Sequence, residues 1–184
     1  MVPIASLWLP ILLSAVIVFF VSFVIHSVLR WHRADHAKLP NEDAVRGVLR
    51  GVTPGDYFTP YSTSPADFKD PAFVEKTKVG PIAVVTILPS PPAPIAKNLG
   101  FWFVYAIVVT AFAAYIAGRS LGPGAPYSQV FRFVGATSFI GYSLALPQAS
   151  IWFGKGWGST LRSMLDGLVY GMLTGGTFGW LWPD

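Results

Sequence analysis

Long apolar runs alternate with shorter polar segments along this chain of 184 residues. The first run covers residues 7–29 and contains no Lys, Arg, Asp or Glu. About 20 apolar residues in a helix cross the ~30 Å hydrocarbon core of a bilayer. Three further runs, 99–118, 128–150 and 161–181, have similar lengths. The pattern therefore predicts an all-α membrane protein with four transmembrane helices, which form one bundle within a single domain over 1–184.

The segment 30–98 between the first two runs differs from them, because it is polar and rich in proline. We expect it to lie on the cytoplasmic face as an insertion after the first helix. Its expected elements are a short amphipathic helix over 41–50 with Asn41 as N-cap, turns over 53–65, a second short helix over 70–76, an extended segment over 82–88 and a stiff proline-rich linker over 89–94.

Charge is scarce in this sequence, at 12% of residues, about half of what soluble domains carry. The basic residues flank the apolar runs and form no aromatic-interleaved patch, which argues against a nucleic-acid partner. Eleven Lys and Arg residues fall on one side of the predicted topology, and only Arg119 and Arg132 fall on the other. The positive-inside rule then places both termini outside and the segment 30–98 on the inner, cytoplasmic side. No Lys or Arg precedes the first run, so we interpret it as a retained helix and not as a cleaved signal peptide.

Glycines recur every four residues in the fourth run, which is the strongest pattern in the sequence. Such a row removes side chains from one stripe of a helix and lets a neighbouring backbone approach closely, as in a glycine zipper. A matching small-residue stripe is expected in the third and second runs, but the bulky first run has none, so we expect that helix to be peripheral or to bind something other than these stripes. The rows serve packing within the chain or a homo-oligomer. Their members are Gly167, Gly171, Gly175 and Gly179; Thr137, Gly141, Ala145 and Ala149; and Ala106, Thr110, Ala114 and Gly118.

Asp166 is the only acidic residue within a predicted span. Intramembrane ionisable residues are functional candidates, but an i,i+4 pair with Arg162 near a helix start is an equally ordinary structural feature. His26 near the end of the first helix could relay protons or sit at the interface. Gln148 could donate a hydrogen bond across the bundle. These four residues are the candidate functional set.

His32 and His36 stand four residues apart, a spacing that metal sites use on helices. The neighbouring Arg33 opposes a cation, and only Glu42 or Asp43 could complete the ligand set, so we expect no metal centre. The chain has no cysteine, which removes disulfides and thiolate ligands. No known catalytic or nucleotide-binding motif is present. We therefore expect no enzyme and no cofactor.

The stretch SIWFGKGWGSTLRSMLDGLVYGMLTGGTFGWLWP over 150–183 carries a short W/F-G-K-G-W loop followed by a helix with spaced glycines. It resembles small four-span bacterial inner-membrane proteins of uncharacterised function, over residues 99–182. The resemblance implies architecture and a bacterial source, and it transfers no activity.

Three functional classes remain from the sequence. The first is a structural or interaction protein, such as an accessory subunit of a larger membrane complex. The second is a small-solute transporter or channel built as an oligomer. The third is a cofactor-binding membrane protein, which the scarcity of ligands disfavours.

Overall fold

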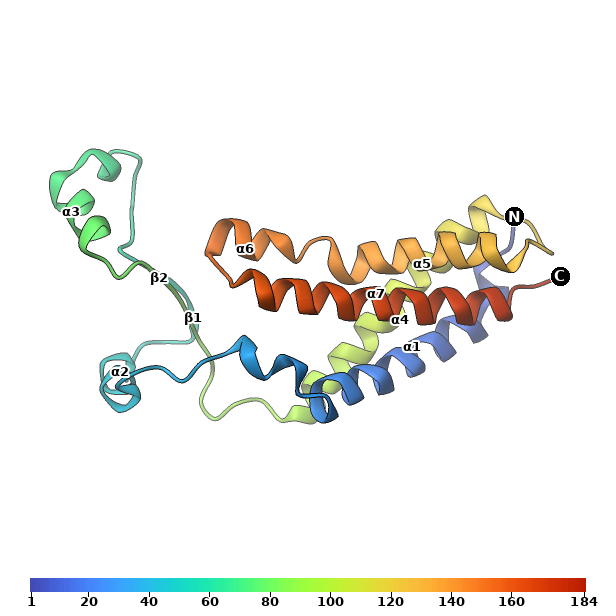
Figure 1. Ribbon diagram of the computed structural model, residues 1–184, viewed down its shortest axis with the longest axis horizontal. Coiled ribbons are helices and arrows are strands. Elements are labelled where there is room, and N and C mark those ends of the chain that lie inside the picture. Colours follow the sequence, from blue (N-terminus) through green and yellow to red (C-terminus); the bar gives the residue numbers. More distant parts are fainter. The chain divides into compact units, whose positions relative to one another are not determined.

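The computed structural model describes all 184 residues and is mostly helical. The chain forms two compact units. One unit combines Met1–Ala37 with Ile95–Asp184 and is a helical bundle (Figure 1). The other unit is the inserted segment Lys38–Pro94. The long apolar runs thus gather in one unit, and the polar insertion forms the other.

Five α-helices belong to the bundle unit. A 3₁₀ turn precedes the first helix, and a π-helical turn continues it through Val24–Val28. The helices are α1 (Trp8–Phe23), α4 (Ile95–Ser120), α5 (Tyr127–Ser143), α6 (Pro147–Phe153) and α7 (Trp157–Trp180).

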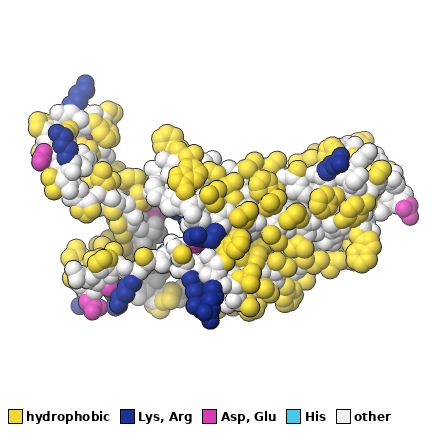
Figure 2. Space-filling view, in the orientation of Figure 1, with side chains coloured by type: hydrophobic (Ala, Val, Ile, Leu, Met, Phe, Trp, Pro, Cys, Tyr) yellow, Lys and Arg dark blue, Asp and Glu magenta, His cyan; other side chains and the backbone are white.

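Three helical segments are long and apolar enough to cross a membrane: Ile4–Val28, Ile95–Ser120 and Tyr127–Phe153. They correspond to the first three predicted spans and indicate association with a membrane. Hydrophobic side chains cover much of the visible face of the bundle (Figure 2). The fourth predicted span corresponds to α7, which has 24 residues but is not among the segments of sufficient apolarity. Its sequence contains Arg162 and Asp166 together with many glycines and threonines.

The four long helices pack in a ring, in which α1 and α5 each contact both α4 and α7. The expectation of a peripheral first helix is therefore wrong. One face of α1 buries residues at helical spacing, among them Ser14, Ala15 and Val18, which are fully buried. Their small size admits neighbours closely, and Trp102 of α4 donates a hydrogen bond from Nε1 to Ser22 Oγ at 2.8 Å.

The glycine row of α7 faces α5 of the same chain along its whole length. A Cβ atom built on Gly171 would lie 2.9 Å from the carbonyl oxygen of Gly135, and one on Gly175 would lie 2.8 Å from that of Phe131. At Gly179 the same atom would lie 2.7 Å from Cδ2 of Tyr127. Because real Cβ atoms essentially never come within 3.0 Å of other atoms, a side chain at Gly171 or Gly175 would require movement of a helix. A side chain at Gly179 would require movement of the Tyr127 ring.

The third apolar run is broken in the structure. α5 ends at Ser143, and α6 begins at Pro147 after a turn. Proline cannot donate the backbone hydrogen bond that would continue α5, but it fits the first turn of a new helix. The predicted small-residue row of this run is therefore split. Gly141 lies against Val109 of α4, whereas Gly135 is the glycine of α5 that packs against α7.

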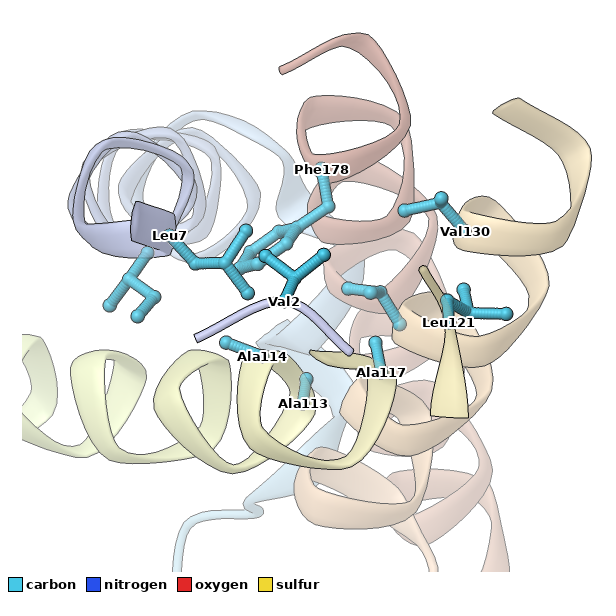
Figure 3. Close-up of a cluster of buried hydrophobic side chains, with 10 residues drawn as sticks. Val2, Leu7, Ala113, Ala114, Ala117, Leu121, Val130 and Phe178 are labelled. Carbon is cyan, nitrogen blue, oxygen red and sulfur yellow. The ribbon is translucent and has the colours of Figure 1, made fainter. Parts of the chain in front are cut away.

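Both termini lie at one end of the bundle (Figure 1). Val2 N donates to Gly118 O at 2.8 Å, and Gly124 N donates to Pro183 O at 2.8 Å. A buried apolar cluster fills this end (Figure 3). Its largest fully buried members are Phe178, Leu7, Val130 and Val134.

The inserted unit contains two short helices and one two-stranded antiparallel sheet. Its elements are α2 (Glu42–Leu49), β1 (Gly55–Thr59), α3 (Pro71–Val79) and β2 (Ala83–Ile87). β2 lies in the extended segment that the sequence predicts, but β1 lies where only turns are expected. The sequence GDYFT is short and begins with the glycine of a Pro-Gly pair, so it lacks a strong strand pattern.

The start of α2 also differs from expectation. Asn41 has a φ of 52°, in the left-handed region, and its side chain makes no capping hydrogen bond. Asp70 does cap α3, because its carboxylate accepts a hydrogen bond from Ala72 N at 2.9 Å. No residue of the inserted unit is buried.

Candidate functional site: a histidine–carboxylate cluster

Five ionisable side chains meet where the chain leaves the first long apolar helix. His32 Nε2 lies 2.8 Å from Asp166 Oδ2, and its Nδ1 lies 2.6 Å from Asp35 Oδ2. Arg162 Nε donates to Asp35 Oδ1 at 2.8 Å. His26 Nε2 lies 3.9 Å from the same oxygen of Asp166. We call these residues the histidine–carboxylate cluster.

Two short helical turns of the chain present the cluster to α7. His26 lies in the π-helical turn Val24–Val28, and His32 and Asp35 lie in the 3₁₀ turn Arg30–Asp35. Side chains at i and i+3 eclipse in a 3₁₀ turn, which brings His32 onto Asp35. π-helical turns are rare and are found frequently at functional sites.

The hydrogen bonds indicate which ring nitrogens of the two histidines carry a proton. His26 Nδ1 lies 2.9 Å from the carbonyl oxygen of Ser22, which can only accept, so Nδ1 is the donor. Both nitrogens of His32 face carboxylate oxygens, so Nδ1 donates to Asp35 and Nε2 donates to Asp166. The Nε2 atoms of both rings are thereby turned toward Asp166, and the rings stack with centroids 4.5 Å apart.

Burial and charge act together on the cluster. The side chains of Asp35 and Asp166 are 7% and 6% exposed, whereas that of His26 is 53% exposed. Burial alone would lower the pKa of His32, but its hydrogen bonds to Asp35 and Asp166 outweigh that effect and raise the pKa. The hydrogen bond from His32, supported by that from Arg162 and opposed by burial, lowers the pKa of Asp35 to about 2.

Aromatic side chains continue from the cluster into the bundle. Tyr170 lies one turn beyond Asp166 on α7 and contacts Tyr142 of α5, with ring centroids 5.4 Å apart. Trp102 of α4 contacts both tyrosines. The hydroxyl groups of Tyr142 and Tyr170 are buried and have no hydrogen-bond partner within the chain. Polar groups thus extend inward from Asp166.

The structure brings together three of the four candidate residues named from the sequence: Asp166, Arg162 and His26. Their pairing differs from the expected one, because Arg162 binds Asp35 and forms no ion pair with Asp166. Gln148 is exposed on α6 and does not point into the bundle.

The pair His32 and His36 does not converge on one site. His36 is exposed, whereas His32 turns toward α7. Glu42, one of the two carboxylates considered for completing that site, lies near Lys38 at 4.0 Å. The roles of His32 and Asp35 in the cluster are new findings of the structure. Only the i,i+3 spacing of these two residues could have suggested their contact.

The chain matches no protein-family model, and no curated protein or solved structure is significantly similar to it.

Proposed function

We propose that the chain is a four-span protein of the bacterial inner membrane that acts as a structural or interaction protein, such as an accessory subunit of a larger complex. The bundle is its membrane anchor, and the inserted unit Lys38–Pro94 meets the partner on the cytoplasmic side. The observation that carries the proposal is the absence of any buried residue in this unit.

The packing of α7 supports a fourth crossing. α7 runs beside α5 along its length, so a membrane that α5 crosses must also hold α7. Its polar and small residues face the bundle, and its outward face is apolar. The outward residues include Leu161, Leu165, Leu168, Met172 and Trp180, each at least 41% exposed. A helix with this distribution has low average apolarity but a lipid-compatible surface.

The orientation rests on the positive-inside rule. Four crossings leave both termini on one side, in keeping with their position at one end of the bundle. The other side then carries the inserted unit and the excess of Lys and Arg. The resemblance to uncharacterised four-span proteins over 99–182 supports the same arrangement.

The inserted unit has 57 residues in two short helices and two strands, and it lacks a core of its own. Folded domains of this size normally bury about 60% of the surface of the unfolded chain. Large apolar side chains remain on its surface instead, including Val48 at 81%, Val79 at 75%, Tyr61 at 72% and Leu88 at 70% exposure. Exposed apolar surface of this kind is typical of protein interaction sites.

Charge favours a protein partner over an anionic surface. The unit carries six basic and six acidic side chains. A lipid surface or nucleic acid would select a clear excess of Lys and Arg. A balanced unit with exposed aliphatic residues is better suited to the apolar centre and polar rim of a protein interface.

Native purification followed by mass measurement tests this proposal. We expect the chain to leave the membrane with a stoichiometric protein partner. Val48→Ser together with Leu88→Ser should release the partner, whereas Lys69→Ser together with Glu75→Ser, two exposed charges of the same unit, should retain it. A wild-type chain that purifies alone from gently solubilised membranes would contradict the proposal.

One observation favours the second candidate function, an oligomeric small-solute transporter or channel. Asp166 is buried, and the unpaired hydroxyls of Tyr142 and Tyr170 continue from it into the bundle. Polar groups at such depth are common along substrate and ion pathways. The glycine row is already occupied by α5, so an oligomer would have to form on another face.

A further inference from the structure

We propose that His26, His32 and Asp166 form a binding site for a divalent transition-metal ion, with Zn²⁺ as the representative. This site lies wholly in the bundle unit and is independent of the proposed partner interaction. The set offers two imidazole nitrogens and one carboxylate oxygen, the donors that zinc and its neighbours in the first transition row prefer.

The three donor atoms already converge. His26 Nε2, His32 Nε2 and a carboxylate oxygen of Asp166 lie within 4.8 Å of one another. Ligands about 2.0–2.1 Å from a tetrahedral zinc are separated by roughly 3.3 Å. The two distances to Asp166 Oδ2, 2.8 Å and 3.9 Å, bracket that separation. The two rings are stacked within 4° of parallel, so ion binding would require them to rotate until both Nε2 atoms point at one position.

Outer hydrogen bonds hold both rings in the form that a metal requires. Metal-binding histidines almost always donate their second nitrogen to a carboxylate or a backbone carbonyl. Here His32 Nδ1 donates to Asp35, and His26 Nδ1 donates to the carbonyl of Ser22. Each ring therefore has its Nε2 atom on the side of Asp166, and a bound cation would replace the proton that His32 Nε2 donates to that carboxylate. This pair of outer contacts is the independent observation that distinguishes the set from a chance cluster.

The surroundings also suit a cation. The guanidinium of Arg162 is bound to Asp35, so its charge is balanced away from the three donors. Asp166 is buried, while the half-exposed ring of His26 leaves access from solvent. Three protein ligands with one open position is the arrangement of zinc sites that bind a further small ligand.

The simpler interpretation is a buried ion pair between protonated His32 and Asp166. That pair explains the 2.8 Å contact, but it requires nothing of His26. Under the ion-pair interpretation, replacing His26 leaves the site unchanged. Under the metal interpretation it removes one of three ligands, so His26 discriminates between the two.

The experiment uses the full-length chain, purified in detergent and stripped of metal. Zn²⁺ binding is measured by calorimetry, and Co²⁺ is used as a visible probe because tetrahedral cobalt absorbs strongly. We expect one ion per chain and a visible Co²⁺ band. His26→Gln and His32→Gln should each weaken binding at least 100-fold and abolish the band. His36→Gln, an exposed histidine four residues from His32, is the matched control and should bind as wild type does.

Asp35→Asn provides a second readout, because loss of an outer partner typically weakens metal binding 10- to 100-fold. The ring of His26 is half exposed, so we expect the His26→Gln variant to fold. Circular dichroism of that variant verifies its folding. The proposal is overturned if wild type binds no Zn²⁺, if folded His26→Gln binds it as tightly as wild type, or if His36→Gln loses it equally.

Discussion

Replacing Gly175 by alanine adds one methyl group where the backbones of α5 and α7 lie close together. The new Cβ would lie 2.8 Å from Phe131 O and 3.1 Å from Gly135 Cα, whereas ordinary van der Waals contact begins at 3.4 Å. Both neighbours are backbone atoms, so relief requires movement of a whole helix. Overpacking of this kind typically destabilises a protein by about 1–3 kcal/mol.

The adjacent Gly176 is a matched control. A Cβ there would meet only the hydroxyl oxygen of Tyr127, at 3.5 Å. Both substitutions gain the same helix propensity, about 1 kcal/mol in favour of alanine. That gain cancels in the comparison, so Gly175→Ala should be less stable than Gly176→Ala by about 1–3 kcal/mol.

Unfolding in mixtures of mild detergent and SDS measures the difference, with tryptophan fluorescence as the signal. The chain has seven tryptophans, and none of them is changed in either variant. Equal free energies of unfolding for the two variants would refute the close packing of α5 on α7.

Three further outcomes follow from single contacts. Hydrogen bonds from Thr63 and Ser64 lower the pKa of Asp67 below its ordinary 3.8. The ionised carboxylate therefore stabilises the turn over residues 63–67 above pH 3.8, and this stabilisation is lost as the pH falls through the lowered pKa. An NMR titration of the Thr63 amide should show a midpoint below 3.8, and a midpoint at or above 3.8 would refute this. Trp102→Phe and Ser22→Ala should show a coupling of about 0.6 kcal/mol in a double-mutant cycle, against zero if the 2.8 Å hydrogen bond is absent. Asp70→Ala should lower the opening free energy of α3 by about 1 kcal/mol, measured by amide hydrogen exchange, and unchanged exchange would contradict the cap.

The positions of the helices could be predicted from the sequence because local patterns determine them. Gly171 and Gly175 repeat at helical spacing, and this periodicity reveals a close-packed face whatever its partner. The partner itself could not be predicted, since Gly135 of α5 carries no special signal until the two helices are placed side by side. The sequence predicts one continuous span over 128–150 and not the break before Pro147, because proline is tolerated in membrane helices whose neighbours satisfy the freed backbone groups.

The cluster was less accessible to sequence reasoning. His32 and Asp166 are separated by 134 residues, and no periodicity connects a loop residue to a helix of another part of the chain. The i,i+4 spacing favours His36 as the neighbour of His32 and, on α7, Asp166 as the partner of Arg162. The fold instead places His32 and Asp35 against α7, so that Arg162 binds the carboxylate of Asp35.

Four crossings of the membrane are the central claim, and the cysteine-free sequence permits a direct test. Single cysteines replace Ser6, Ala66 and Asp184, three exposed positions near the N-terminus, in the inserted unit and at the C-terminus. Spheroplasts that express each variant are treated with a membrane-impermeant maleimide. Four crossings predict labelling at 6 and 184 in intact spheroplasts, and labelling at 66 only after permeabilisation. Labelling of 184 on the same side as 66 would mean that α7 does not cross, and it would contradict the account.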